Sequence, residues 1–212
     1  MTKTNARRPF FGRMYPRMAR ALDEGGMAGR RRDLLAGLTG EVVEVGAGHG
    51  VNFALYPAEV TRLVAVEPEP RLREQARIAG AGATISVEVV PGLADRLPPA
   101  DHSVDAVVFC LVLCSLPDVG AALAEARRVL KPGGQVRFLE HVRAGTPAMV
   151  RVQRVLDATV WPHLAGGCHT GRDTLAEIER AGFTLEDVER FLLPEARTPF
   201  SFHVLGAATL RV

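Results

Sequence analysis

Residues 41–52 read Glu-Val-Val-Glu-Val-Gly-Ala-Gly-His-Gly-Val-Asn, an apolar run followed by a glycine-rich turn. Its valines form a short apolar run that suits a strand buried on both faces of a parallel sheet. Gly46, Gly48 and Gly50 predict a turn that tolerates positive φ and lets a ligand approach the backbone where a Cβ would collide. We expect the charged Glu44 to lie at the exposed carboxyl end of the strand, and a helix to begin near Gly50.

A second acid, Glu67, ends the apolar run Leu63–Val66, twenty-one residues after Gly46. Open α/β sheets bind ligands at the ends of neighbouring strands, where a carboxylate can accept two hydrogen bonds from a ribose diol. The glycine spacing differs from the dinucleotide fingerprint, because Val51 occupies the place of the third glycine. Glu44 has no role beside a pyrophosphate but suits a positive amino or sulfonium group. The pattern therefore favours a cationic aminoacyl nucleoside over a nicotinamide dinucleotide.

Further segments extend this pattern downstream: Pro91–Pro98, Asp101–Val108 and Ala126–Gly134. With the glycine turn and Glu67, the chain resembles the class I S-adenosylmethionine-dependent methyltransferases of the "methyltransferase type 11" branch, over roughly residues 38–142. The resemblance implies a Rossmann-like α/β fold, in which a seven-stranded, mostly parallel sheet carries helices on both faces and an N-terminal helical cap. It also implies S-adenosylmethionine as the donor and S-adenosylhomocysteine as the product.

The same resemblance implies a set of cofactor-binding residues. They are Glu44, Gly46, Ala47, Gly48, Asn52, Glu67, Pro68, Leu93, Ala94, Cys110 and Leu111. Family members often carry an acid at the position of Leu93 to bind the adenine amine, so adenine recognition here would fall to backbone groups of Leu93 and Ala94. Cys110 and Leu111, at the end of an apolar strand, would form the wall near the methyl group.

Alternating strand and helix signals predict a doubly wound parallel sheet in one domain, residues 38–212. The predicted strands are 41–45, 62–66, 84–90, 104–110 and 134–140, with a closing hairpin near 183–190 and 202–211. The predicted helices of this domain are 50–56, 70–79, 118–130 and 170–182. Two earlier helices, 13–24 and 26–37, are separated by Gly25 and Gly26, and we expect residues 1–37 to cap the cofactor cleft.

The C-terminal part narrows the resemblance. Leu139–Val142, Trp161–Thr174 and Pro199–Gly206 are similar to segments of small methyltransferase-like proteins related to alkyl thiol methyltransferases and bacterial phospholipid N-methyltransferases. This implies a small lipophilic acceptor that offers a thiol, an amine or a hydroxyl. We expect the insertion 146–163 to roof the acceptor pocket with its apolar helical face, Val152, Val155, Leu156 and Thr159. The candidate pocket residues are Tyr15, Trp161, His169 and Arg172.

A sulfonium methyl group is already activated, so direct SN2 displacement needs mainly an acceptor atom aligned about 3 Å from the methyl carbon. Thiolates and neutral amines need little more than desolvation and alignment, whereas a phenol or alcohol benefits from a general base. His141, at the end of the predicted fifth strand, is the candidate base, and a purely structural histidine is the alternative. A non-catalytic binding or regulatory protein remains the rival function, because a cofactor site does not prove turnover.

Three cysteines, Cys110, Cys114 and Cys168, are odd in number and lack C-x-x-C spacing, so neither a disulfide framework nor a zinc finger is predicted. His163 and His169 flank Cys168, but this spacing matches no standard zinc site. The sequence therefore predicts no metal.

Length and composition agree with a single globular unit, since the chain has 212 residues of which 47% are hydrophobic. Residues 1–32 hold nine basic side chains against two acidic ones, although the net charge is only +2. This segment either contacts an anionic membrane or forms the solvated face of a lid helix. Nucleic acid is not an expected partner. The longest apolar run, Ala106–Cys114, is too short to span a bilayer, so we expect a cytoplasmic protein; the oligomeric state stays open.

Overall fold

The computed structural model describes residues 9–159 and 161–210. Within these ranges it contains one seven-stranded sheet. The strands are β1 (Gly40–Val45), β2 (Val60–Val66), β3 (Val87–Val90), β4 (Val104–Cys110), β5 (Leu130–His141), β6 (Phe183–Leu192) and β7 (Phe202–Leu210). Their spatial order is β3-β2-β1-β4-β5-β7-β6, with β7 antiparallel to both of its neighbours and all other pairs parallel. The predicted fold class, including the closing hairpin, is confirmed.

This strand order places a crevice between β1 and β4. The chain runs outward from β1 through β2 to β3 and then returns to the other side of β1 with β4. The chain therefore leaves β1 and β4 toward opposite edges of the sheet, and open α/β sheets bind ligands at such a switch point, beyond the carboxyl ends of the strands. The glycine turn of residues 46–50 follows β1 directly.

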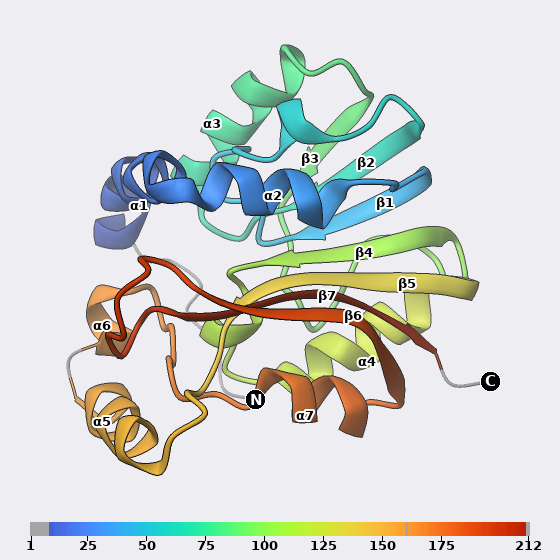
Figure 1. The fold of residues 1–212 in the computed structure, drawn as a ribbon. Helices are drawn as coiled ribbons and strands as arrows, with labels where there is room; N and C mark the ends of the chain where they lie inside the picture. Colours follow the sequence, from blue (N-terminus) through green and yellow to red (C-terminus); the bar gives the residue numbers. More distant parts are fainter. Residues whose placement is uncertain (1–8, 160, 211–212) are drawn as a thin grey trace, which may run out of the picture.

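In the described part of the chain, seven α-helices flank the sheet: α1 (Pro9–Leu22), α2 (Ala28–Leu35), α3 (Pro70–Ala81), α4 (Val119–Val129), α5 (Pro147–Asp157), α6 (Trp161–Leu164) and α7 (Thr174–Arg180). Two of them begin at acidic caps, where Glu69 and Asp118 accept hydrogen bonds from the backbone N–H groups of Leu72 and Ala121. Figure 1 shows α1, α5 and α6 gathered at the end of the sheet where the parallel strands finish. The expected N-terminal helices therefore lie beside the predicted cleft.

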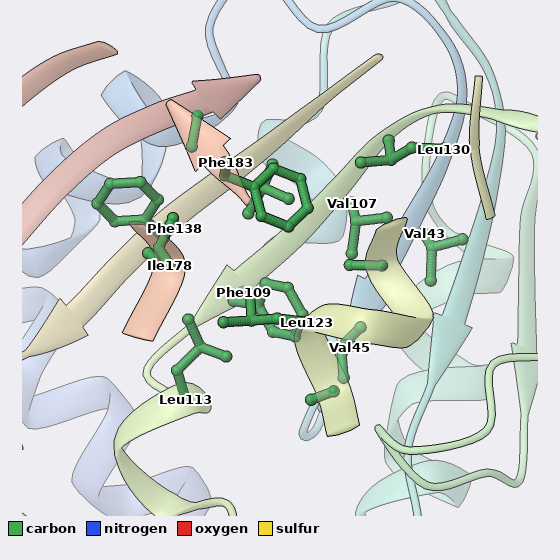
Figure 2. Packing of buried hydrophobic residues seen from close by; sticks show 14 of the residues in the cluster. Val43, Val45, Val107, Phe109, Leu113, Leu123, Leu130, Phe138, Ile178 and Phe183 are labelled. Atoms are coloured by element: carbon green, nitrogen blue, oxygen red, sulfur yellow. The ribbon is translucent and has the colours of Figure 1, made fainter. Parts of the chain in front are cut away.

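The core follows from the two-residue period of the strands. In β1, Val43 and Val45 point to the face covered by α4 and α7 and belong to one core cluster with Leu123 and Ile178 of those helices (Figure 2). Val42 points to the opposite face, covered by α2 and α3. Because both faces are buried, the central strands read as nearly continuous apolar runs, which is why they could be found in the sequence.

The expected helix 50–56 is wrong. Only a short 3-10 turn, Phe53–Leu55, follows the glycine loop. Gly50 adopts φ +85°, outside the helical region, and a Cβ there would lie 2.7 Å from the Phe53 ring. The apolar pattern of this segment thus reflects packing of Phe53 into the core rather than a helix.

The insertion also differs from expectation. It contains α5 (Pro147–Asp157) and most of the short α6 (Trp161–Leu164), and the side of α5 expected to roof the pocket faces solvent, since Val152 and Val155 are 49% and 67% exposed. The buried residue of α5 is Gln153. Its side-chain oxygen accepts a hydrogen bond from the N–H of Ala144, and its side-chain nitrogen donates to the carbonyls of Val142, Thr170 and Pro199. The hydrogen bonds of this one side chain to four backbone groups determine the orientation of α5 more strongly than its apolar face does.

The break between the first two helices is confirmed near Gly26, which has φ +111° inside a turn of π type, Asp23–Met27. No helix among the described residues combines the length and the apolar character that crossing a bilayer would need.

Candidate active site

A cavity of about 190 Å³ opens at the carboxyl ends of β1, β2, β3 and β4. Its floor comes from the glycine turn and the ends of the strands, and its cover comes from Phe11 and Tyr15 of α1 together with Gly166. Of the residues expected to bind cofactor, Gly46, Gly48, Glu67, Pro68, Leu93, Ala94 and Leu111 line it. Tyr15, expected in the acceptor pocket, lines the same cavity.

The glycine turn packs so closely against its neighbours that side chains at Gly46 and Gly48 would have no space. Gly46 and Gly48 have φ values of +68° and +60°, which favour glycine. A Cβ on Gly46 would lie 2.7 Å from Val112, and a Cβ on Gly48 would lie 2.7 Å from the Tyr15 ring. The backbone of this turn is therefore accessible to a ligand, while Val112 packs against Gly46 and Tyr15 packs against Gly48.

Glu67 occupies the crest of β2 beside this turn. Its Oε2 accepts a hydrogen bond from the N–H of Gly48, and its Oε1 accepts one from the N–H of Glu69, both at 2.8 Å. These bonds hold the carboxylate in place and leave further lone pairs on each oxygen for a ligand. Burial raises the pKa of Glu67 to about 7, against the effect of the two backbone donors.

Glu44 is not exposed, contrary to expectation. It is 1% exposed, and its two oxygens accept hydrogen bonds from Asn52 at 2.7 Å and from the Tyr56 hydroxyl at 3.0 Å. Burial raises its pKa to about 7, while Asn52 and Tyr56 act against that shift. Glu44, Ala47, Asn52 and Cys110 do not line the cavity but lie behind its wall.

A buried arginine joins this wall to the cap. Arg31 of α2 is 1% exposed and donates from Nε to Asp23 at 2.9 Å, and from Nη1 to Asn52 at 3.1 Å and to the Cys110 sulfur at 3.0 Å. Asn52 continues the chain of hydrogen bonds to Glu44. In the sequence Arg31 is one of the nine basic residues of segment 1–32, for which membrane contact and a solvated helix face were the alternatives, and nothing local distinguishes it from Arg30 and Arg32.

The turn after β4 forms the opposite wall. Leu111 has φ +59°, a conformation that costs a non-glycine residue roughly 1–2 kcal/mol. The turn is held by the buried carboxylate of Glu140, which accepts hydrogen bonds from the N–H groups of Val112, Leu113 and Cys114. Burial raises the pKa of Glu140 to about 7, opposed by these donors. A strained residue at the edge of a site, held in its conformation by hydrogen bonds to neighbouring residues, is typical of ligand-binding sites.

The remaining expected pocket residues occupy different places. Arg172 donates from Nη1 to the carbonyls of Leu113 and Leu116, and so braces the turn rather than facing the cavity. Trp161 stacks on Phe200 with 4.8 Å between ring centroids. His169 lines a second cavity, of about 470 Å³. Four residues line both cavities, which therefore adjoin: Phe11, Ser115, Leu116 and Pro117.

His141 does not line the first cavity. Its Nδ1 lies 3.6 Å from the Cys168 sulfur and 3.9 Å from the Cys114 sulfur, and its ring packs on His203 with 4.3 Å between centroids. Cys114 and His141 hold the pKa of Cys168 below its usual value, while Cys168 and burial raise that of Cys114. No local sequence pattern indicates this cluster, because its members come from three distant segments.

Comparison with known proteins agrees with this geometry. A family model described as a methyltransferase domain matches residues 43–138. The thiol S-methyltransferase TMT1B of Rattus norvegicus is 35% identical over 86% of this chain and 79% of its own length, and TMT1A of Homo sapiens is 33% identical over the same shares. The chain belongs to the S-adenosylmethionine-dependent methyltransferases.

Solved structures show the same fold. A methyltransferase of Thermotoga maritima superimposes with a TM-score of 0.69 at 23% identity, covering 95% of this chain and 98% of its own. A geranyl diphosphate methyltransferase reaches a TM-score of 0.67 at 18% identity, with 89% and 86% covered. The methyltransferase assignment and the class I fold, both expected from the sequence, are thus confirmed.

The methyltransferase uses S-adenosylmethionine as donor and releases S-adenosylhomocysteine. Three features of the cavity fit this molecule, whose sulfonium supplies an activated methyl group. The glycine turn offers exposed backbone beside Tyr15, Glu67 offers carboxylate lone pairs for ribose hydroxyls, and Leu93 and Ala94 offer an apolar edge for a base. The Arg31 Nη2, buried without a hydrogen-bond partner among the described residues, adds positive charge behind the turn.

Proposed function

We propose that this methyltransferase transfers its methyl group to the sulfur of a small lipophilic thiol. The observation that supports the proposal is the similarity to thiol S-methyltransferases across 86% of the chain, which extends well beyond the cofactor half. Specificity in this fold resides in those outer segments rather than in the sheet. Other methyltransferases match only about half of this chain, so their similarity gives no comparable information about the acceptor.

The cavity chemistry supports an apolar acceptor. Leu111, Val112, Leu116 and Pro117 line the first cavity, with Phe11 above them, and the second cavity adds Phe10 and Pro162. An apolar guest in such a site gains roughly 25 cal/mol for each Å² of apolar surface removed from water. We infer that the acceptor enters through the second cavity, past His169, and presents its sulfur near Ser115.

The transfer needs few protein groups. The acceptor thiolate forms a bond to the methyl carbon while the bond from that carbon to the sulfonium sulfur breaks, and the thiol proton leaves to water. A free cysteine thiol has a pKa of about 8.5; a simple alkyl thiol is a weaker acid, so only a small thiolate fraction of the acceptor is present near neutral pH. Desolvation by the apolar walls and alignment by the turn after β4 then provide the rate enhancement, without a base at His141.

Methyl-labelled S-adenosylmethionine, incubated with matched alkyl thiols, amines and phenols of equal chain length, tests this proposal. We expect labelled thioether as the main product, identified by mass. Labelled amine or ether in its place would refute the thiol assignment. Retention of labelled donor on the protein, with no product from any acceptor, would favour the alternative of a non-catalytic binding protein.

We further propose that α1 makes peripheral contact with anionic membranes. Arg13, Arg17 and Arg20 are exposed on this helix, and Phe10 and Met14 are exposed beside them. The basic residues Lys3, Arg7 and Arg8 lie outside the described residues. Each exposed arginine near an anionic bilayer contributes about 1 kcal/mol. This arrangement supports an interfacial role for the cap.

Replacement of Arg13 and Arg17 by glutamate should therefore abolish cosedimentation with phosphatidylserine vesicles. Binding to pure phosphatidylcholine vesicles should be weak for every variant, because no surface charge attracts the helix. Arg180→Glu, an exposed arginine on α7, is the matched control. If the wild type fails to sediment with anionic vesicles, or if Arg180→Glu lowers binding equally, α1 is not the contact.

A further inference from the structure

Three potential metal-ligand atoms meet behind the wall of the two cavities. Cys114 comes from the turn after β4, His141 from the end of β5, and Cys168 from the loop between α6 and α7. His141 Nδ1 lies 3.6 Å from the Cys168 sulfur and 3.9 Å from the Cys114 sulfur, and all three donor atoms lie within 4.8 Å of one another. No other function described above uses this convergence.

We propose that Cys114, His141 and Cys168 bind a thiophilic metal ion, with zinc as the expected occupant. A tetrahedral zinc ion with Zn–S bonds of about 2.3 Å and Zn–N bonds of about 2.0–2.1 Å holds sulfur and nitrogen donors about 3.6 Å apart. The two sulfur-to-nitrogen distances agree with that geometry within a few tenths of an ångström. The ion would need only small side-chain movements to enter.

The chemistry of the donors selects the metal. Two thiolates and one imidazole are soft ligands, which suit zinc and disfavour magnesium or calcium. Two thiolates also neutralise a divalent ion, so that the complex carries no net charge. This matters because Cys114 and Cys168 are only 1% and 4% exposed, and an isolated charge would be costly at such burial.

The ligands are held in place from behind, as metal sites require. The backbone carbonyl of Phe200 accepts a hydrogen bond from the His141 ring, and the buried His203 ring packs against it. The N–H of His169 donates to the carbonyl of Cys114 at 2.8 Å, which joins the two cysteine segments directly. The site is therefore preformed.

Three protein ligands leave the fourth position of a tetrahedral ion open for water or an exogenous ligand. Ser115 and Gly167, the sequence neighbours of the two cysteines, both line the second cavity. The ion would thus connect three segments that together form one wall of the proposed acceptor path. This inference does not depend on the acceptor being a thiol, because its test measures metal alone.

The test begins with the wild-type protein. The metal content of protein purified without chelator is measured, the metal is removed with a chelator, and Co²⁺ is titrated into the reduced apoprotein. We expect about one ion per chain and thiolate-to-cobalt charge-transfer absorption, displaced by zinc. We also expect zinc to raise the melting temperature, since an ion that binds only the folded state stabilises it.

Cys114→Ser, Cys168→Ser and His141→Gln should each lose the charge-transfer band or most of its intensity and abolish the zinc-dependent rise in melting temperature. Cys110→Ser and His163→Gln are the matched controls, since these residues lie outside the cluster, and both should retain one ion. Circular dichroism shows whether each variant is folded. A reduced wild-type apoprotein that binds no Co²⁺, or a metal-free protein that carries a Cys114–Cys168 disulfide when purified without reductant, would overturn the proposal.

Discussion

Glu67→Ala is expected to weaken S-adenosylmethionine binding about 100-fold. Two hydrogen bonds from ribose hydroxyls to a charged acceptor contribute about 3 kcal/mol together, which corresponds to that factor. The substitution also removes the acceptor that holds the N–H groups of Gly48 and Glu69, so the glycine turn loses its support. Isothermal titration calorimetry with S-adenosylmethionine and S-adenosylhomocysteine measures the loss.

Glu59→Ala is the matched control, because Glu59 is exposed and does not line the cavity. It should leave the Kd within about two-fold of the wild type, as expected for a surface substitution. Glu67→Gln keeps one acceptor oxygen, so its Kd should lie between those of Glu67→Ala and Glu59→Ala. Unchanged affinity in folded Glu67→Ala protein would remove Glu67 from the donor site.

The same residue should make donor binding depend on pH. Burial raises the pKa of Glu67 to about 7 in the free protein, whereas bound ribose hydroxyls stabilise its carboxylate. Below about pH 7 the free protein must therefore lose a proton to bind, and affinity should fall by up to about ten-fold per pH unit. Donor binding by the Glu67→Gln variant should not depend on pH in this way. The comparison distinguishes titration of Glu67 from titration of the ligand.

Much of the donor site could be predicted because its signals are local. A glycine turn after a buried strand, and an acid at the end of the next one, lie within residues 41–67, so spacing alone brings Glu67 to Gly48. The structure confirms that contact with a 2.8 Å hydrogen bond. Leu93 and Ala94, which only the family resemblance implied, line the same cavity.

The unpredicted features depend on tertiary contacts. The 146–163 insertion has an apolar helical stripe, yet the hydrogen bonds of one buried glutamine orient the helix, and no periodicity reveals them. Cys114, His141 and Cys168 are separated by 27 residues at each step and converge only because β4 and β5 end beside the same loop. Spacing rules for metal sites describe local loops and therefore overlook such a cluster.

Arg31→Met is expected to lower the free energy of unfolding by about 3–5 kcal/mol, the range for removing one partner from a buried ionic network. Methionine fills much of the volume but leaves Asp23, Asn52 and Cys110 without their donor. Arg32→Met, at the neighbouring exposed position, is the matched control and should change stability by less than about 0.5 kcal/mol. Urea unfolding followed by circular dichroism gives both values.

The effect of Arg31→Met should extend to the donor site, because this residue joins the cap to the wall behind the glycine turn. Loss of the bond to Asn52 frees the partner of Glu44, and a looser α2 lets α1 withdraw Tyr15 from Gly48. Donor affinity should then fall even at temperatures where the variant is fully folded. A double-mutant cycle of Arg31→Met with Asn52→Ala measures this link: a coupling free energy near zero would mean that cap and cofactor site are stabilised independently.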